Sequence, residues 1–116
     1  MAQISPIIKQ IKEFAENDSI AFKKHSAIRM RQRNISANEV KEILIGGQVI
    51  EDYPDDIPLP TCLILGFTKK QKPIHAVVAV DESDRMLYVI TVYSPNNEEW
   101  ENGFKKRRET HEMPIM

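Results

Sequence analysis

The sequence is short of cysteine and of long apolar runs, and each shortage excludes a class of protein. Cys62 is the single cysteine among 116 residues, so no intrachain disulfide can form and a cysteine-based zinc site has no support. No run of about eighteen apolar residues is present to cross a membrane. The N-terminus also lacks the basic start and the long apolar stretch of a secretory signal. We therefore expect a cytoplasmic protein that does not enter a membrane.

Recognisable sites for metals, phosphates and cofactors are missing as well. The three histidines are scattered, without the paired spacing of a metal site. The four glycines form neither a glycine-rich phosphate loop nor a nucleophile elbow. We therefore expect no metal and no cofactor, and P-loop enzymes, kinases and serine hydrolases have no support.

What is present is enough apolar sequence for one core. Hydrophobic residues make up 41% of the chain, which suits a single domain over residues 1–116 and leaves no room for a second. Apolar spacing and capping signals predict helices over residues 7–15, 25–33 and 36–46. Strands are predicted over residues 48–53, 62–67, 73–80 and 86–93, and a C-terminal helix over residues 98–108. The expected class is α+β, with N-terminal helices, a four-stranded, mostly antiparallel sheet and a C-terminal helix.

Alternation along the last two predicted strands indicates which side chains share a face of the sheet. In the third strand, Ile74 and Val78 face one way and His75 faces the other. In the fourth strand, the same rule places Tyr93 on a face with Leu87. Both strands are nearly all apolar, so we expect them at the centre of the sheet.

Positive charge is concentrated in one stretch, although the net charge is only −1. Residues 22–41 carry six lysines and arginines against one glutamate, a local balance of +5. In the second predicted helix, His25, Arg29 and Arg33 recur every four residues and share one face, with about 6 Å between successive members. Such a face suits phosphate groups. Our candidate RNA-binding residues are Lys23, Lys24, Arg29 and Arg33.

Two other interpretations of this stretch stay open. An arginine-rich helix face is often simply solvated. It can also pair with carboxylates, and acidic clusters are present at Glu51-Asp52, Asp55-Asp56 and Glu98-Glu99. Internal pairing would explain the near-neutral total, whereas unpaired cations would form one positive groove on an acidic body.

Several motifs occur in order along the chain. They are His25-x-x-x-Arg29-Met30-x-x-Arg33-Asn34-Ile35-Ser36, Gly47-x-Val49-Ile50-Glu51-x-Tyr53, Pro58-x-Pro60, Pro73-Ile74-His75-Ala76-Val77-Val78, and Ile90-Thr91-Val92-Tyr93-x-Pro95 with Trp100. With these motifs the sequence resembles family 4258 of the domains of unknown function over about residues 22–108. That family looks like a branch of the RelE/ParE-type toxins. The resemblance implies two helices on one face of a small sheet, a basic groove on the other face, and a cognate antitoxin protein as partner.

The resemblance also implies a function, which is that of a toxin-like endoribonuclease of a type II toxin-antitoxin system. Such an enzyme cleaves mRNA without a metal, often on the ribosome. Attack of a 2′-hydroxyl on the adjacent phosphate needs a base, an acid and cations near the phosphate. His25 and His75 are candidates for base or acid, and Arg29 and Arg33 for holding the phosphate. Tyr93 is a candidate for stacking on a base or donating a proton.

Each of these roles has a simpler alternative. His75 also suits an imidazole that is hydrogen-bonded within the sheet, and Tyr93 suits a packed strand aromatic. The alternative function is a non-catalytic binding module, either a ParE-like gyrase inhibitor or a protein-interaction domain. This alternative includes the case in which the protein-interaction domain forms a homodimer.

Overall fold

The computed structural model describes residues 7–108, so residues 1–6 and 109–116 lie outside the account that follows. The elements along the chain are α1 (Ile7–Glu16), β1 (Ile20–Phe22), α2 (Lys24–Gln32), α3 (Ala37–Gly46), β2 (Gln48–Tyr53), β3 (Thr61–Phe67), β4 (Pro73–Asp81) and β5 (Met86–Tyr93). This arrangement confirms the α+β class and the three helices of the N-terminal half. Within residues 7–108, no helix is long and apolar enough to cross a membrane.

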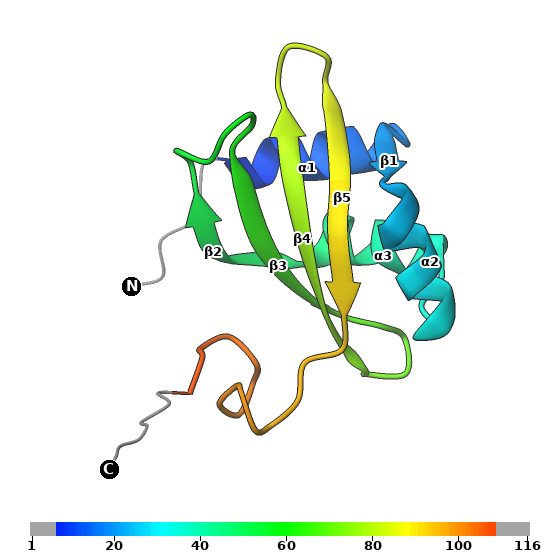
Figure 1. Ribbon diagram of the computed structural model, residues 1–116, viewed down its shortest axis with the longest axis vertical. Coiled ribbons are helices and arrows are strands. Elements are labelled where there is room, and N and C mark those ends of the chain that lie inside the picture. The colour runs from blue at the N-terminus through cyan, green and yellow to red at the C-terminus, as the bar shows by residue number, and fades with distance from the viewer. Residues whose placement is uncertain (1–6, 109–116) are drawn as a thin grey trace.

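The sheet has the strand order β1-β5-β4-β3-β2, and only the pairing of β1 with β5 is parallel. Helices α1 and α3 lie behind the sheet in Figure 1, while α2 lies beside β5 at one edge. We call the sheet surface that faces away from α1 and α3 the open face. The main core fills the space between these two helices and the other surface of the sheet.

The third helix is fixed to the sheet by its cap and by a close contact. The predicted capping box is confirmed, because the Glu39 backbone N–H donates to Ser36 Oγ over 3.0 Å and the Ser36 N–H donates to Glu39 Oε1 over 2.9 Å. On the buried side, a Cβ atom added at Gly66 of β3 would lie 2.6 Å from the side chain of Ile43. Helix α3 can therefore rest directly on β3 only because position 66 is glycine.

The sheet has five strands rather than the four predicted. The additional strand, β1, pairs with the start of β5 from Ile20 opposite Leu87 to Phe22 opposite Val89. Three residues are too few for an alternating pattern to show in the sequence, and this strand is held by its pairing rather than by its own propensity.

The C-terminal helix predicted over residues 98–108 is wrong. The chain forms turns there, with a β-bridge between Trp100 and Arg107 and a hydrogen bond of 2.9 Å from the Glu101 N–H to the Lys106 carbonyl. Gly103 lies between them with a φ of +90°, which a helix does not allow. The Asn-Gly pair at this point is a strong turn signal, and it overrides the helical spacing of the apolar residues.

A β-bulge interrupts the pairing of the two central strands. Val77 lies opposite Thr91, but the next residue, Val78, lies opposite Val89. Ile90 is therefore an extra residue in β5, and the alternation of side chains along that strand changes phase at this position.

The bulge corrects the predicted face of Tyr93. Leu87 lies in the main core as expected, but beyond the bulge the core residue is Val92. Tyr93 lies opposite His75, on the open face, so the prediction that it shares a face with Leu87 is wrong. The predicted position of His75, on the face opposite Ile74, is confirmed.

A second bulge acts in the same way in β2. Val49 lies opposite Ile64, and Glu51 lies opposite Leu63, which leaves Ile50 as the extra residue. Val49 packs against the main core, whereas Glu51 is turned to the open face. Two bulges on opposite sides of β4 thus direct a carboxylate and a phenol to the same surface.

Candidate functional site

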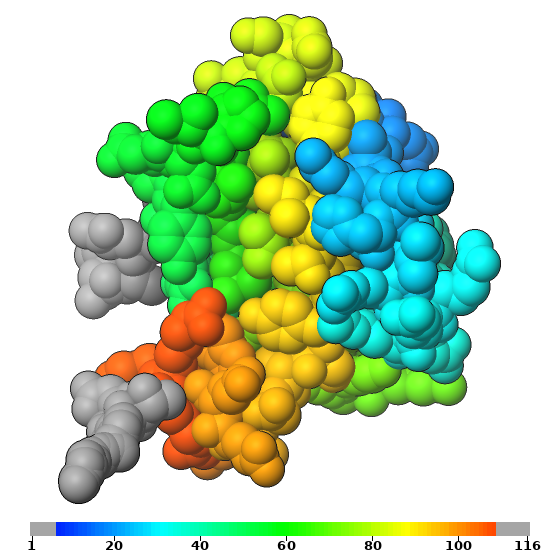
Figure 2. Space-filling model, viewed as in Figure 1, coloured from blue at the N-terminus to red at the C-terminus, as the bar shows by residue number. Residues whose placement is uncertain are grey.

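The open face is built from three rows of paired residues across β3, β4 and β5. The rows are Thr61-Ala79-Tyr88, Leu63-Val77-Thr91 and Leu65-His75-Tyr93. Figure 2 shows this surface as a hollow between the loop after β2, in green, and the segment of β1 and α2, in blue and cyan. Residues 94–108, which we call the C-terminal strap, lie across one end of the hollow and appear in orange.

The strap is held against the sheet by Trp100 and Arg107. Trp100 is buried, and its ring meets the ring of His75 edge to face with 4.3 Å between the centroids. The Arg107 guanidinium lies 4.7 Å from the centre of the Trp100 ring. It also donates to both carboxylate oxygens of Glu51, over 2.7 and 3.2 Å, and Tyr53 donates a third hydrogen bond to Glu51 over 2.6 Å. The carboxylate turned outward by the bulge in β2 thus fastens the strap.

His75 is fully buried beneath the strap, and its two ring nitrogens have different partners. Nε2 lies 2.8 Å from the carbonyl oxygen of Phe104, which only accepts, so Nε2 carries a hydrogen. Nδ1 lies 3.1 Å from the Tyr93 hydroxyl. Burial lowers the pKa of His75 despite the opposing effect of the Phe104 carbonyl, so the ring is neutral at neutral pH and Nδ1 accepts from Tyr93. His75 therefore positions Tyr93 and the strap and has no access to solvent in this arrangement.

The other ionisable groups of this cluster are also shifted. Burial raises the pKa of Glu51, but the hydrogen bonds from Arg107 and Tyr53 outweigh it, so the net shift is downward and the carboxylate is charged. The hydrogen bond to Glu51 raises the pKa of Tyr53, and burial raises the pKa of Tyr93. Clusters of shifted groups occur at functional sites and at structural ion pairs alike. Within this cluster, Tyr93 is half-buried and lies opposite His75 in one of the three rows of the open face.

The basic residues of α2 and of its two caps form no salt bridge with any carboxylate of residues 7–108. These residues are Lys23, Lys24, His25, Arg29, Arg31 and Arg33, and all are exposed. The salt bridges in this part of the chain are Lys41–Asp18, Lys69–Glu42, Arg85–Glu13 and Arg107–Glu51. The sequence left open the interpretation that these basic residues pair with carboxylates of the chain. The structure contains no such pair among residues 7–108.

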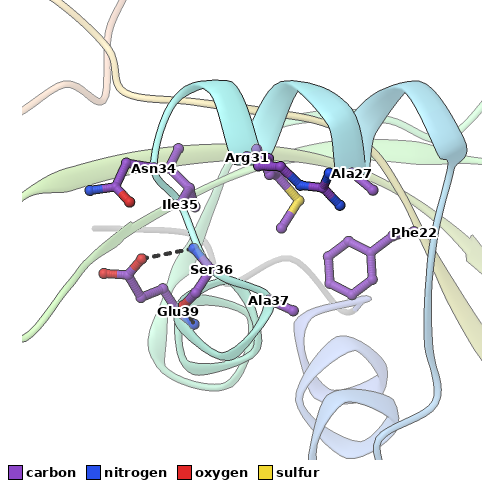
Figure 3. A pocket seen from close by; sticks show the side chains of 9 residues that line it. Phe22, Ala27, Arg31, Asn34, Ile35, Ser36, Ala37 and Glu39 are labelled. Atoms are coloured by element: carbon purple, nitrogen blue, oxygen red, sulfur yellow. Dashed lines mark hydrogen bonds between the residues drawn. The ribbon is translucent and has the colours of Figure 1, made fainter.

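These cations divide between two sides of α2. Ala27 and Arg31 lie on the side that faces Phe22 and α3, where they line a surface groove (Figure 3). Arg29 is two residues from Arg31, a rotation of roughly 200° around a helix, so it points the opposite way, toward the open face. His25 lies one turn before Arg29 on that same side. We call His25, Arg29 and Arg33 the basic face of α2.

Two of the candidate residues have positions that the sequence did not indicate. Lys24 falls on the Arg31 side of the helix, away from the basic face. Arg33, at the C-cap of α2, donates from Nη1 to the Val92 carbonyl oxygen over 2.6 Å. This carbonyl lies on the edge of β5 past Val89, the last residue that pairs with β1. Arg33 therefore supplies the hydrogen bond to an acceptor at the strand edge and connects α2 to the sheet.

The two residues that fasten the strap over His75 escaped sequence reasoning. Glu51 and Arg107 are 56 positions apart, and only the bulge in β2 and the turn at Gly103 bring them together.

Cys62 lies in the main core, where burial raises the pKa of its thiol to about 12, so it is not a nucleophile. Among the described residues, no group of three or more His, Cys, Asp or Glu side chains could hold a metal ion.

The shifted histidine predicts how stability depends on pH. The folded pKa of His75 lies below its value in the unfolded chain, about 6.5, so the unfolded chain binds protons first as the pH falls. We expect the melting temperature to fall between pH 7.5 and pH 5.5. His75→Gln should melt lower at pH 7.5 but lose less over this range, whereas His25→Gln, at an exposed position, should keep the wild-type dependence. Thermal melts at both pH values test this, and an undiminished loss in His75→Gln would contradict it.

Comparison with known proteins places the central part of the chain in a family. No curated protein and no solved structure matches it significantly. The family described as domain of unknown function (DUF4258) matches residues 22–94, a shorter range than the 22–108 expected. The match includes α2, α3 and strands β2 to β5, and it ends where the strap begins. Since it covers more than half of the 116 residues, the chain belongs to the DUF4258 family of domains of unknown function.

Proposed function

We propose that this protein is a toxin-like endoribonuclease that binds mRNA along its open face and is inhibited by a cognate antitoxin protein. The observation that carries the proposal is the basic face of α2, whose cations have no carboxylate partner among residues 7–108. Four carboxylates of residues 7–108 form salt bridges, those of Glu13, Asp18, Glu42 and Glu51, and each pairs with a cation outside α2. A surface of this kind attracts a polyanion, which brings its own negative charge.

The arrangement favours a single strand of RNA over a duplex. His25 and Arg29 are about 6 Å apart along the helix axis, so one strand can contact both with adjoining phosphates. Tyr93 lies on the open face in β5, the strand that α2 contacts, and single strands bind by stacking unpaired bases on such rings. A paired base inside a duplex would not reach it.

The proposed chemistry needs no metal. His25 is the one histidine of the described residues that is exposed, and it takes the proton of a 2′-hydroxyl. The resulting oxygen attacks the adjacent phosphorus, the bond to the 5′-oxygen breaks, and the imidazolium returns the proton to that oxygen. Arg29, with the remaining N–H groups of Arg33, stabilises the negative charge on the phosphate as the bonds change. His75 acts through Tyr93, which it positions.

The first test compares two arginines of the same helix. Arg29→Ala should weaken binding of a short single-stranded RNA, and the slope of log K against log salt should fall by about 0.7, the value for one lost phosphate contact. Arg31→Ala removes the same charge from the other side of α2 and should change binding little. Fluorescence anisotropy at several salt concentrations measures both variants. Equal effects would show that only overall charge matters and would contradict a specific basic face.

The second test separates proton transfer from binding. His25→Ala should abolish RNA cleavage by the protein freed of its antitoxin while RNA affinity stays within about threefold, because a proton-transfer group contributes to the transition state more than to binding. Arg31→Ala should still cleave, and thermal melts should confirm that both variants are folded. If the wild-type protein binds RNA but cleaves none, with or without ribosomes, the enzyme proposal fails and a non-catalytic binding module replaces it.

A further inference from the structure

A pocket of about 450 Å³ lies on the open face at the end away from the strap. Its floor is formed by Ala79 and Tyr88, which are neighbours across β4 and β5, together with Ile90 at the bulge. One wall is the loop after β2, residues 56–59, and the other is Lys23. The volume is in the range of small-molecule sites, and the floor offers an aromatic ring and aliphatic groups.

The pocket reaches the N-terminal end of α2, the helix that carries the basic face. Lys23 lines the pocket and is also the N-cap residue of α2. His25 and Arg29 follow on the side of the helix that points to the open face. The mouth of the pocket lies within one or two helical turns of His25. A molecule whose phosphate contacts His25 can therefore place the group attached to that phosphate at the mouth of the pocket.

The rim of the pocket accepts hydrogen bonds. Asp56 uses Oδ2 to accept from the Thr61 hydroxyl over 2.5 Å, and Asp81 uses Oδ1 to accept from the Asp84 backbone N–H over 3.1 Å. In each carboxylate the second oxygen has no hydrogen bond to the described residues. Two carboxylates and one lysine make this pocket unsuitable for a phosphate, because the negative charges repel it.

We propose that this pocket holds one nucleobase of the bound RNA and that it prefers guanine. The inference rests on the proposed function, because the phosphates next to that base are those on the basic face. A base supplies a flat, apolar surface to stack on the Tyr88 ring. Guanine presents two adjacent donors, N1–H and the N2 amino group, to a single carboxylate, whereas adenine and cytosine present one amino group and uracil presents only its N3–H.

The test uses the full chain and four labelled hexanucleotides that consist of uridine with a single G, A, C or U at the third position. Anisotropy at constant salt should show at least fivefold tighter binding for the G-containing RNA than for the all-uridine RNA, as expected for a two-donor contact. Asp81→Asn and Asp56→Asn each keep one side-chain oxygen for the local hydrogen bond but replace the second carboxylate oxygen, which would accept from guanine. The preference for the G-containing RNA should therefore fall to less than twofold in at least one of these variants. Asp55→Asn, an exposed neighbour that does not line the pocket, is the charge-matched control and should keep the preference.

The outcomes separate the pocket from the function on which it rests. If all four RNAs bind equally while Arg29→Ala still weakens RNA binding, the proposed guanine pocket is overturned. The proposal that RNA binds along the open face then stands. Loss of preference in Asp55→Asn as well would assign the effect to overall charge and would also overturn the guanine pocket. Absence of RNA binding would overturn both proposals. Tight binding of a lysine-rich peptide that is lost in Asp81→Asn would assign the pocket to a basic protein partner instead.

Discussion

The extra residue at Ile90 in β5 is the constraint on which the open face depends. It shifts the alternation of side chains so that Val92 enters the core and Tyr93 faces outward beside His75. Without it, the Tyr93 ring would point at the helices, and His75 would lack its partner for Nδ1. The bulge at Ile50 has the matching effect on Glu51, which fastens the strap through Arg107. The surface is therefore shaped by two irregularities of an otherwise regular sheet.

The placement of α2 explains why a chain with a net charge of −1 still presents a positive face. Strand β1 covers only the first part of the β5 edge, and α2 continues along the remainder, where Arg33 satisfies the Val92 carbonyl. The helix is therefore held with His25 and Arg29 toward the open face. Because the carboxylates of the salt bridges lie on other elements, charge neutrality of the whole chain and a local positive surface coexist.

Sequence reasoning located the elements whose patterns are local. The capping box at Ser36 and the apolar runs of the central strands identified α3, β4 and β5, because caps and periodicity are properties of neighbouring residues. It failed where distant pairing decides the result. The short strand β1 exists through its partner, the bulge at Ile90 depends on register against β4, and Glu51 meets Arg107 only after the strap has turned back. His75 and Tyr93 were found as residues, but their contact was not.

The central claim is that RNA lies along the open face, between the pocket and the strap, against the basic face of α2. Titration of the isotope-labelled protein with a short single-stranded RNA, followed by NMR of the backbone amides, tests it most directly. The account predicts that the largest shift changes occur from Lys23 to Arg29 and from Tyr88 to Tyr93, with little change in α1 and α3. Shift changes centred on the groove between α2 and α3, or spread evenly over the surface, would contradict it.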